Sequence, residues 1–188
     1  MNCIDYREIW QNINCLVPVY DVNGGNFTEI RLDDGMALID NRKTINCFKN
    51  LARIFAADIP AAKDIYFNLT QRKNSIPLPF HSRLVLIPLK FREPLAKNDG
   101  AWGYVVLAKV ASYEQHPEVK GVVRIFFMDG GSIDVLHQMA SVRAIVDDAN
   151  RISKAFNELH LTDMKRQSTL REEPLVYVLF PCEQIKRH

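Results

Sequence analysis

Short apolar runs separated by glycine-containing turns are the feature of this sequence that most limits its possible folds. The clearest turns are Asn23-Gly24-Gly25, Asp33-Asp34-Gly35 and Asp129-Gly130-Gly131, which are typical of connections between antiparallel strands. Residues 84–91 are almost continuously apolar and predict a buried strand, in which Pro88 marks an edge or a bulge. The pattern favours a sheet-rich chain.

Further apolar runs predict more strands, and two segments predict helices. The remaining strand candidates cover residues 15–22, 27–32, 36–39, 64–70, 102–110, 119–128 and 132–136. Residues 41–58 place Ile45, Phe48, Ala52 and Phe55 at helical spacing. A second helix follows Ser141, a candidate N-cap, through apolar positions 142, 145, 146, 149, 152, 156 and 159.

These patterns predict one domain of the α+β class, rich in strands and with two or three helices. We place it over residues 1–160, followed by a C-terminal tail at 161–188 that holds one candidate strand, residues 175–180. A chain of 188 residues buries roughly 70% of its unfolded surface and needs no disulfide to be stable. The cysteines at positions 3, 15, 47 and 182 are widely spaced, and we expect them to be reduced thiols.

Charge is unevenly distributed, although the formal net charge is only +2. Residues 1–40 carry two basic and seven acidic side chains, whereas residues 41–97 carry eleven basic and three acidic ones. In the first predicted helix, Arg42, Asn46, Lys49 and Arg53 fall within about 60° of one another, opposite the apolar side. A basic region of this kind suggests contact with a polyanion, most often nucleic acid; an ordinary solvated face is the alternative.

No catalytic or metal-binding motif stands out in the sequence. The five histidines lack the spacing of a zinc site, and glycine-rich phosphate-binding motifs and the G-x-S-x-G motif are missing. The apolar runs are far shorter than the ~20 residues that cross a membrane, and the first residues do not form a signal peptide. We therefore expect a cytoplasmic, non-enzymatic protein with no cofactor, no metal and no membrane contact.

An ordered series of short motifs gives the sequence a family resemblance. The basic helix leads into Arg53-Ile54-Phe55-Ala56-Ala57; then come Ile76-Pro77, Leu86-Ile87-Pro88, Arg92-Glu93-Pro94, Ala101-Trp102-Gly103-Tyr104-Val105 and Phe127-Met128-Asp129-Gly130-Gly131-Ser132-Ile133. This order resembles the competence transcription factor family (ComK), bacterial regulators that bind DNA, over residues 17–156. The sequence departs from the family where alanines ending in Ala62-Lys63 replace a glycine-rich turn, and after Leu159, where the family has no clear counterpart.

The resemblance implies a transcription regulator that binds paired A·T-rich boxes in double-stranded DNA, largely through the minor groove, as a homodimer or higher oligomer. Arg, Lys and Asn side chains suit that narrow groove of negative potential. Family analogy also suggests a proteolytic adaptor as a partner and association with the nucleoid. The predicted DNA-binding residues are Arg42, Lys43, Asn46, Lys49, Asn50, Arg53, Arg72, Lys73, Arg83, Lys90 and Arg92, with Asn74 beside them.

Two other classes of function remain as alternatives. The chain could be a protein-interaction or small-ligand module whose basic face binds an acidic partner. It could also be an enzyme in which Arg92, Trp102 and Tyr104 line a pocket. The consecutive apolar residues 125–127 further predict a strand with both faces at least partly covered, by the second helix and by another protomer or by the same domain.

Overall fold

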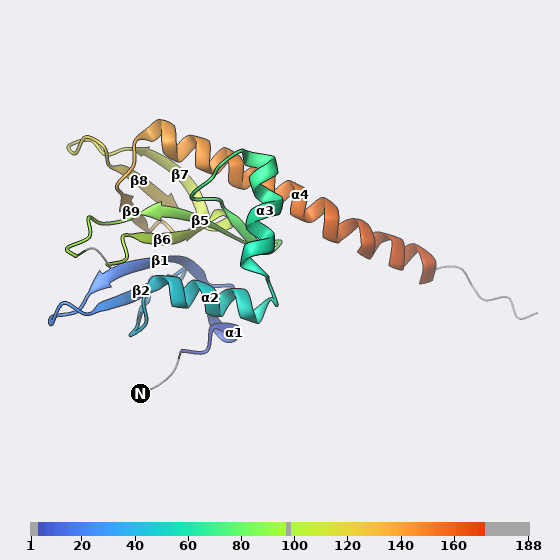
Figure 1. Cartoon of the computed structure of the whole chain (residues 1–188), viewed down its shortest axis with the longest axis horizontal. Helices are drawn as coiled ribbons and strands as arrows, with labels where there is room; N and C mark the ends of the chain where they lie inside the picture. Colours follow the sequence, from blue (N-terminus) through green and yellow to red (C-terminus); the bar gives the residue numbers. More distant parts are fainter. Residues whose placement is uncertain (1–3, 97–98, 172–188) are drawn as a thin grey trace, which may run out of the picture.

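The apolar runs build two antiparallel sheets, which Figure 1 shows with the helices around them. The computed structural model describes residues 4–96 and 99–171. Its elements in chain order are α1 (Tyr6–Ile9), β1 (Ile13–Tyr20), β2 (Asn26–Leu32), β3 (Ala37–Asp40), α2 (Thr44–Ile54), α3 (Ile59–Thr70), β4 (Leu78–His81), β5 (Leu84–Lys90), β6 (Trp102–Val106), the 3-10 helix η1 (Leu107–Lys109), β7 (Val110–Gln115), β8 (Val123–Phe127), β9 (Ser132–Val135) and α4 (Met139–Arg171). The chain is a mixed α+β domain, as the sequence predicts.

The larger sheet has six strands in the order β3-β2-β1-β6-β5-β4. The predicted hairpin joins β1 to β2 with Tyr20 opposite Asn26, and Gly24 in its turn has φ +80°, which glycine adopts without steric cost. Strand β4 pairs with β5 only as far as Leu86, so Pro88 lies where β6 alone continues the ladder. The missing N–H of proline therefore removes no ladder bond there.

Two hydrophobic cores lie on opposite faces of the six-stranded sheet. Leu86 belongs to the first core, with Phe48 and Leu51 of α2. Its neighbour Ile87 belongs to the second, with residues of β8, β9 and α4 such as Val142. Successive residues of a strand point to opposite faces, so the continuous apolar run of β5 supplies both cores. The sheet thus separates α2 from the three-stranded sheet β7-β8-β9, whereas α4 packs in the second core and also reaches the first, where it contacts α3 and β4.

Residues 64–70 lie in helix α3, so the prediction of a strand there is wrong. Asp58 accepts a hydrogen bond from a first-turn amide (3.1 Å), and Pro60 occupies that first turn, which together begin a helix. Tyr66 is buried, whereas Ile65 is exposed. The cap and proline, which lie before the alternating segment, outweigh its two-residue alternation.

Helix α4 is longer than predicted. It begins at Met139, two residues before Ser141, which is therefore not its N-cap, and it continues past the predicted domain boundary at residue 160. Its first half buries Val142 and Ile152 in the cores, whereas its second half extends away from the sheets (Figure 1), and Leu159 is 67% exposed. The candidate strand at 175–180 lies outside the described residues.

Two predicted strands are shorter than the sequence pattern indicates. Residues 102–110 divide into β6, η1 and the start of β7, because the chain passes there from the larger sheet to the smaller one. Only Val123–Phe127 of the segment 119–128 is a strand. In β8, Ile125 is buried and Phe126 on the other face is half-buried. The described part of the chain contains four α-helices, against two or three predicted.

Candidate nucleic-acid interface

Helix α2 turns its predicted polar side to solvent. Burial of Phe48 and Leu51 fixes the rotation of the helix and leaves Asn46, Lys49 and Arg53 exposed; we call these three residues the α2 face. The helix contains no acidic residue, and neither cation of the α2 face has a carboxylate partner among the described residues. The helix thus presents two unneutralised positive charges and an amide.

Both ends of α2 are held by hydrogen bonds. The Thr28 hydroxyl on β2 donates to the carbonyl of Arg42 (2.7 Å) and lies 3.2 Å from the Thr44 hydroxyl. At the other end, the amide of Ala56 donates to the Arg53 carbonyl (3.1 Å), and Ala56 has φ +50°. A left-handed residue commonly ends a helix, and it is usually glycine. Here alanine occupies that position.

Arg42 precedes α2 and does not extend the α2 face, so its predicted place in the helical stripe is wrong. Its guanidinium donates two hydrogen bonds to the buried Asp40 carboxylate, at 2.8 and 2.6 Å. Tyr6 donates a third through its hydroxyl (2.8 Å). Burial alone would raise the pKa of Asp40, but the bonds from Arg42 and Tyr6 bring that pKa below its ordinary value. Arg42 is therefore a structural cation.

Arg72 and Lys90 also form ion pairs with carboxylates of the same chain. The Arg72 side chain, in the loop after α3, pairs with Asp148 of α4, which is only 3% exposed and also pairs with Arg151. Lys90 at the end of β5 lies 2.5 Å from Glu93. Each of these cations thus already has a carboxylate partner within the chain.

Arg92 is held in a polar cluster beside the β1–β2 hairpin. Its guanidinium lies 3.6 Å from the centre of the Tyr20 ring, donates to the Gly100 carbonyl (2.8 Å) and hydrogen bonds to the Asn26 side chain. Burial lowers the pKa of Arg92 from its ordinary value. The cluster fixes the loop after β5 against the hairpin, and Arg92 is half-buried in it.

The remaining predicted residues differ in exposure. Lys43, Lys73 and Arg83 are exposed, whereas Asn50 is half-buried on α2. Lys43 is the residue before the first turn of α2, and Lys73 with Asn74 lies in the loop between α3 and β4. Arg83 occupies the β4–β5 turn, 5.9 Å from the centre of the Trp10 ring. Of the eleven predicted residues, six are exposed (Lys43, Asn46, Lys49, Arg53, Lys73 and Arg83) and five are half-buried.

A groove of about 520 Å³ runs beside the α2 face, between α2, α3 and strands β5 and β6. We call it the α2–α3 groove. The residues that line it include Ile45, Lys49, Lys63, Asn74, Trp102 and Tyr104. Ile45, predicted on the apolar side of α2, is 46% exposed at the edge of this groove. Lys63 of α3 lines the same groove but is not among the predicted DNA-binding residues.

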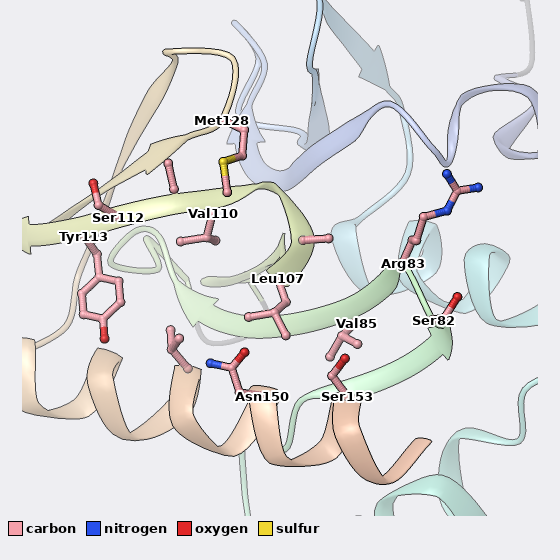
Figure 2. A pocket seen from close by; sticks show the side chains of 13 residues that line it. Ser82, Arg83, Val85, Leu107, Val110, Ser112, Tyr113, Met128, Asn150 and Ser153 are labelled. Atoms are coloured by element: carbon pink, nitrogen blue, oxygen red, sulfur yellow. The ribbon is translucent and has the colours of Figure 1, made fainter. Parts of the chain in front are cut away.

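A second cavity, of about 380 Å³, lies on the other side of the large sheet. Figure 2 shows Asn150 and Ser153 of α4 on one side of it, with the Tyr113 side chain directed from β7 toward the helix. Leu107 and other apolar side chains complete the wall, and Arg83 is the one charged residue among those that line it. The mixture of apolar and neutral polar groups suits a small amphipathic molecule.

Comparisons with protein-family models, curated proteins and solved structures find no match to the chain. Within residues 4–96 and 99–171, no cluster of His, Cys, Asp and Glu has the arrangement of a metal site. None of the helices in that part combines the length and apolar character that a membrane span requires. Cys15 and Cys47 are buried free thiols; Cys3 and Cys182 lie outside the described residues.

Proposed function

We propose that the chain is a non-enzymatic, DNA-binding transcription regulator that contacts A·T-rich duplex through the α2 face and the exposed loop cations. The observation that carries this proposal is the α2 face itself, an exposed helix side with two cations and no carboxylate. An exposed cation with no internal acid gains most when it neutralises a phosphate, because counterions are then released. Lys43, Lys73 and Arg83 add exposed basic residues on nearby loops.

The type of side chain supports contact with the minor groove of A·T-rich DNA. That groove offers mainly hydrogen-bond acceptors, so Lys, Arg and Asn donors fit it. Asn46 and Lys49 stand on one short helix that has no acid to repel the narrow, strongly negative groove. The minor-groove mode is the one that the resemblance to the competence transcription factor family implies, and the basic helix is one of the features that carry that resemblance.

We further propose that two or more protomers bind together. One α2 face covers only a few base pairs, so paired boxes need a second copy about one helical turn of DNA away, roughly 34–36 Å, or a multiple of it. The projecting half of α4, with Leu159 exposed, and the half-buried Phe126 on β8 supply apolar surface for self-association. Sedimentation equilibrium with a two-box duplex tests this: protomers that bind each box independently would contradict it.

The test of DNA binding is a titration of the protein against two labelled duplexes, one A·T-rich and one G·C-rich, in rising salt. We expect tighter binding to the A·T-rich duplex and a linear fall of log affinity with log salt, with a slope of about −0.9 per phosphate contact. Affinity that ignores both salt and base composition would contradict the proposal.

A small-ligand module is the second candidate, and the cavity in Figure 2 favours it. Its polar groups come from α4, β7 and the β4–β5 turn, so a ligand there would bridge three separate parts of the chain. A thermal-shift screen with small amphipathic carboxylates separates the candidates. A ligand that stabilises the protein while duplex DNA leaves its melting temperature unchanged would favour this function over DNA binding.

A further inference from the structure

The α2–α3 groove combines a half-exposed tryptophan with a stacked aromatic pair. Trp102 on β6 is 43% exposed, and its ring contacts the edge of His137 with the centroids 5.7 Å apart. Two residues further along the same face of β6, Tyr104 stacks on Phe48 of α2, with centroids 4.3 Å apart and planes at 11°. The tryptophan therefore leaves apolar ring surface open in the groove, where a flat aromatic group can cover it.

Basic side chains stand on two walls of the same groove. Lys49 comes from α2 and Lys63 from α3, and both are exposed. No carboxylate belongs to the residues that line the groove, so its field favours an anion. The groove thus offers an apolar ring surface between two positive charges, the combination by which proteins bind unpaired nucleotides.

Polar groups at one side of the groove match the edge of a nucleobase. Asn74 and Ser75 contribute an amide and a hydroxyl, which can donate or accept hydrogen bonds. Burial raises the pKa of Tyr104 to about 12, so its hydroxyl remains protonated and can donate. The volume of about 520 Å³ lies within the ~300–1,000 Å³ of typical small-molecule sites.

We infer that the α2–α3 groove holds one unpaired nucleobase of the bound DNA, with the base on Trp102 and the flanking phosphates on Lys49 and Lys63. This inference rests on the proposed function, because Lys49 belongs to both the α2 face and the groove. Its consequence is a preference for duplex that carries an unstacked or extrahelical base over duplex that is fully paired.

The experiment compares two A·T-rich duplexes that differ by one unpaired thymine, with affinity measured by fluorescence anisotropy. The full chain should bind the bulged duplex about tenfold more tightly, because stacking on the protein gains free energy and the unpaired base costs little to extrude. The Trp102→Ala variant should lose most of this preference, whereas Trp102→Phe should retain part of it. Ile65→Ala removes an exposed apolar side chain outside the groove and is the matched control.

A 2-aminopurine placed at the unpaired position supplies a second measurement. Its fluorescence should be quenched on binding to the parent protein and less so on binding to Trp102→Ala; Trp102→Leu replaces that variant if alanine prevents folding. Equal affinity for bulged and paired duplex overturns the groove inference and leaves the proposed function standing. If neither duplex binds but an oligothymidine binds and depends on Trp102, the proposed function fails and the groove inference stands.

Discussion

Two basic regions of the molecule differ in what their charges contact. On the α2 face, Lys49 and Arg53 are exposed and have no carboxylate partner in the described part of the chain. Where α3 meets α4, Arg72 and Arg151 both pair with the buried Asp148. The first region can bind an external anion without breaking an internal contact, whereas the second would first have to leave a carboxylate buried and unpaired. A cluster of basic residues in the sequence therefore indicates a binding surface only where no acidic side chain from elsewhere in the chain forms ion pairs with them.

The largest expected effect is on stability, and it comes from substituting one of the paired arginines. Arg72→Ala should lower the free energy of unfolding by about 3 kcal/mol, because Asp148 is buried and keeps only Arg151 as its cationic partner. Chemical denaturation measures this decrease. DNA affinity of the folded fraction should remain within about twofold of the parent.

A matched double variant separates the stabilising effect of the ion pair from the cost of burying its charged groups. Arg72→Met with Asp148→Leu removes both partners and supplies apolar groups of similar size, which commonly restores most of the stability that the single change removes. A double variant as unstable as Arg72→Ala would show that the ion pair stabilises the α3–α4 packing by more than mutual neutralisation.

The next prediction concerns Arg42, which is close to the α2 face in sequence but belongs with the paired cations. Arg42→Ala should cost about 1–2 kcal/mol of stability at neutral pH, since Asp40 is buried and keeps only its bonds from the Tyr6 hydroxyl and from the backbone amide of residue 42. The pKa of Asp40 is lowered in the folded protein, so this stabilisation is present above the ordinary pKa of 3.8 and is lost as pH falls through the folded value.

Acid denaturation curves therefore test the role of Arg42. The parent should lose stability more steeply than Arg42→Ala as the medium is acidified below about pH 4, so that the two curves converge at low pH. Curves that stay parallel would mean that Arg42 does not determine the pKa of Asp40.

The smallest effect is expected at the turn that ends α2. Ala56 has φ +50°, a left-handed conformation that disfavours a residue with a Cβ atom. Ala56→Gly should raise the free energy of unfolding by about 0.5–1 kcal/mol. This is the net result of two opposing effects: glycine relieves the backbone strain of the folded state, but it also increases the conformational entropy of the unfolded chain. Thermal unfolding can resolve the gain, and a decrease in stability would show that the alanine side chain contributes more through packing than it costs in strain.

The sequence predicts the parts of this fold that depend on short-range signals. The Asn23-Gly24-Gly25 turn correctly places the first hairpin, and the spacing of Phe48 and Ala52, both buried, correctly orients α2. The sequence pattern fails for two different reasons. Residues 64–70 alternate like a strand, but the N-cap Asp58 and Pro60 just before them begin the helix that contains them, so two short-range signals conflict. The end of β6 depends on distant segments, because it cannot be located without the second sheet.

The candidate site follows the same division between local and distant information. Exposure of Asn46, Lys49 and Arg53 follows from the helical period alone. The partner of Arg72 lies on α4, more than 70 residues away, so sequence spacing could not reveal it. Lys63 lines the α2–α3 groove from α3, and its position beside α2 depends on the packing of the two helices, which sequence spacing does not give.

The most direct test of the central claim compares the salt dependence of duplex affinity for two variants of equal charge change. Lys49→Ala with Arg53→Ala removes the free cations, and Arg42→Ala with Arg72→Ala removes the paired ones; both are measured on the A·T-rich duplex under conditions where the protein is folded. We predict that the first pair lowers affinity and flattens the slope of log affinity against log salt by about 0.9 for each phosphate that is no longer neutralised. The second pair should leave that slope unchanged. A parent-like slope in the first pair, or an equal reduction in both, would contradict the claim that the α2 face binds DNA.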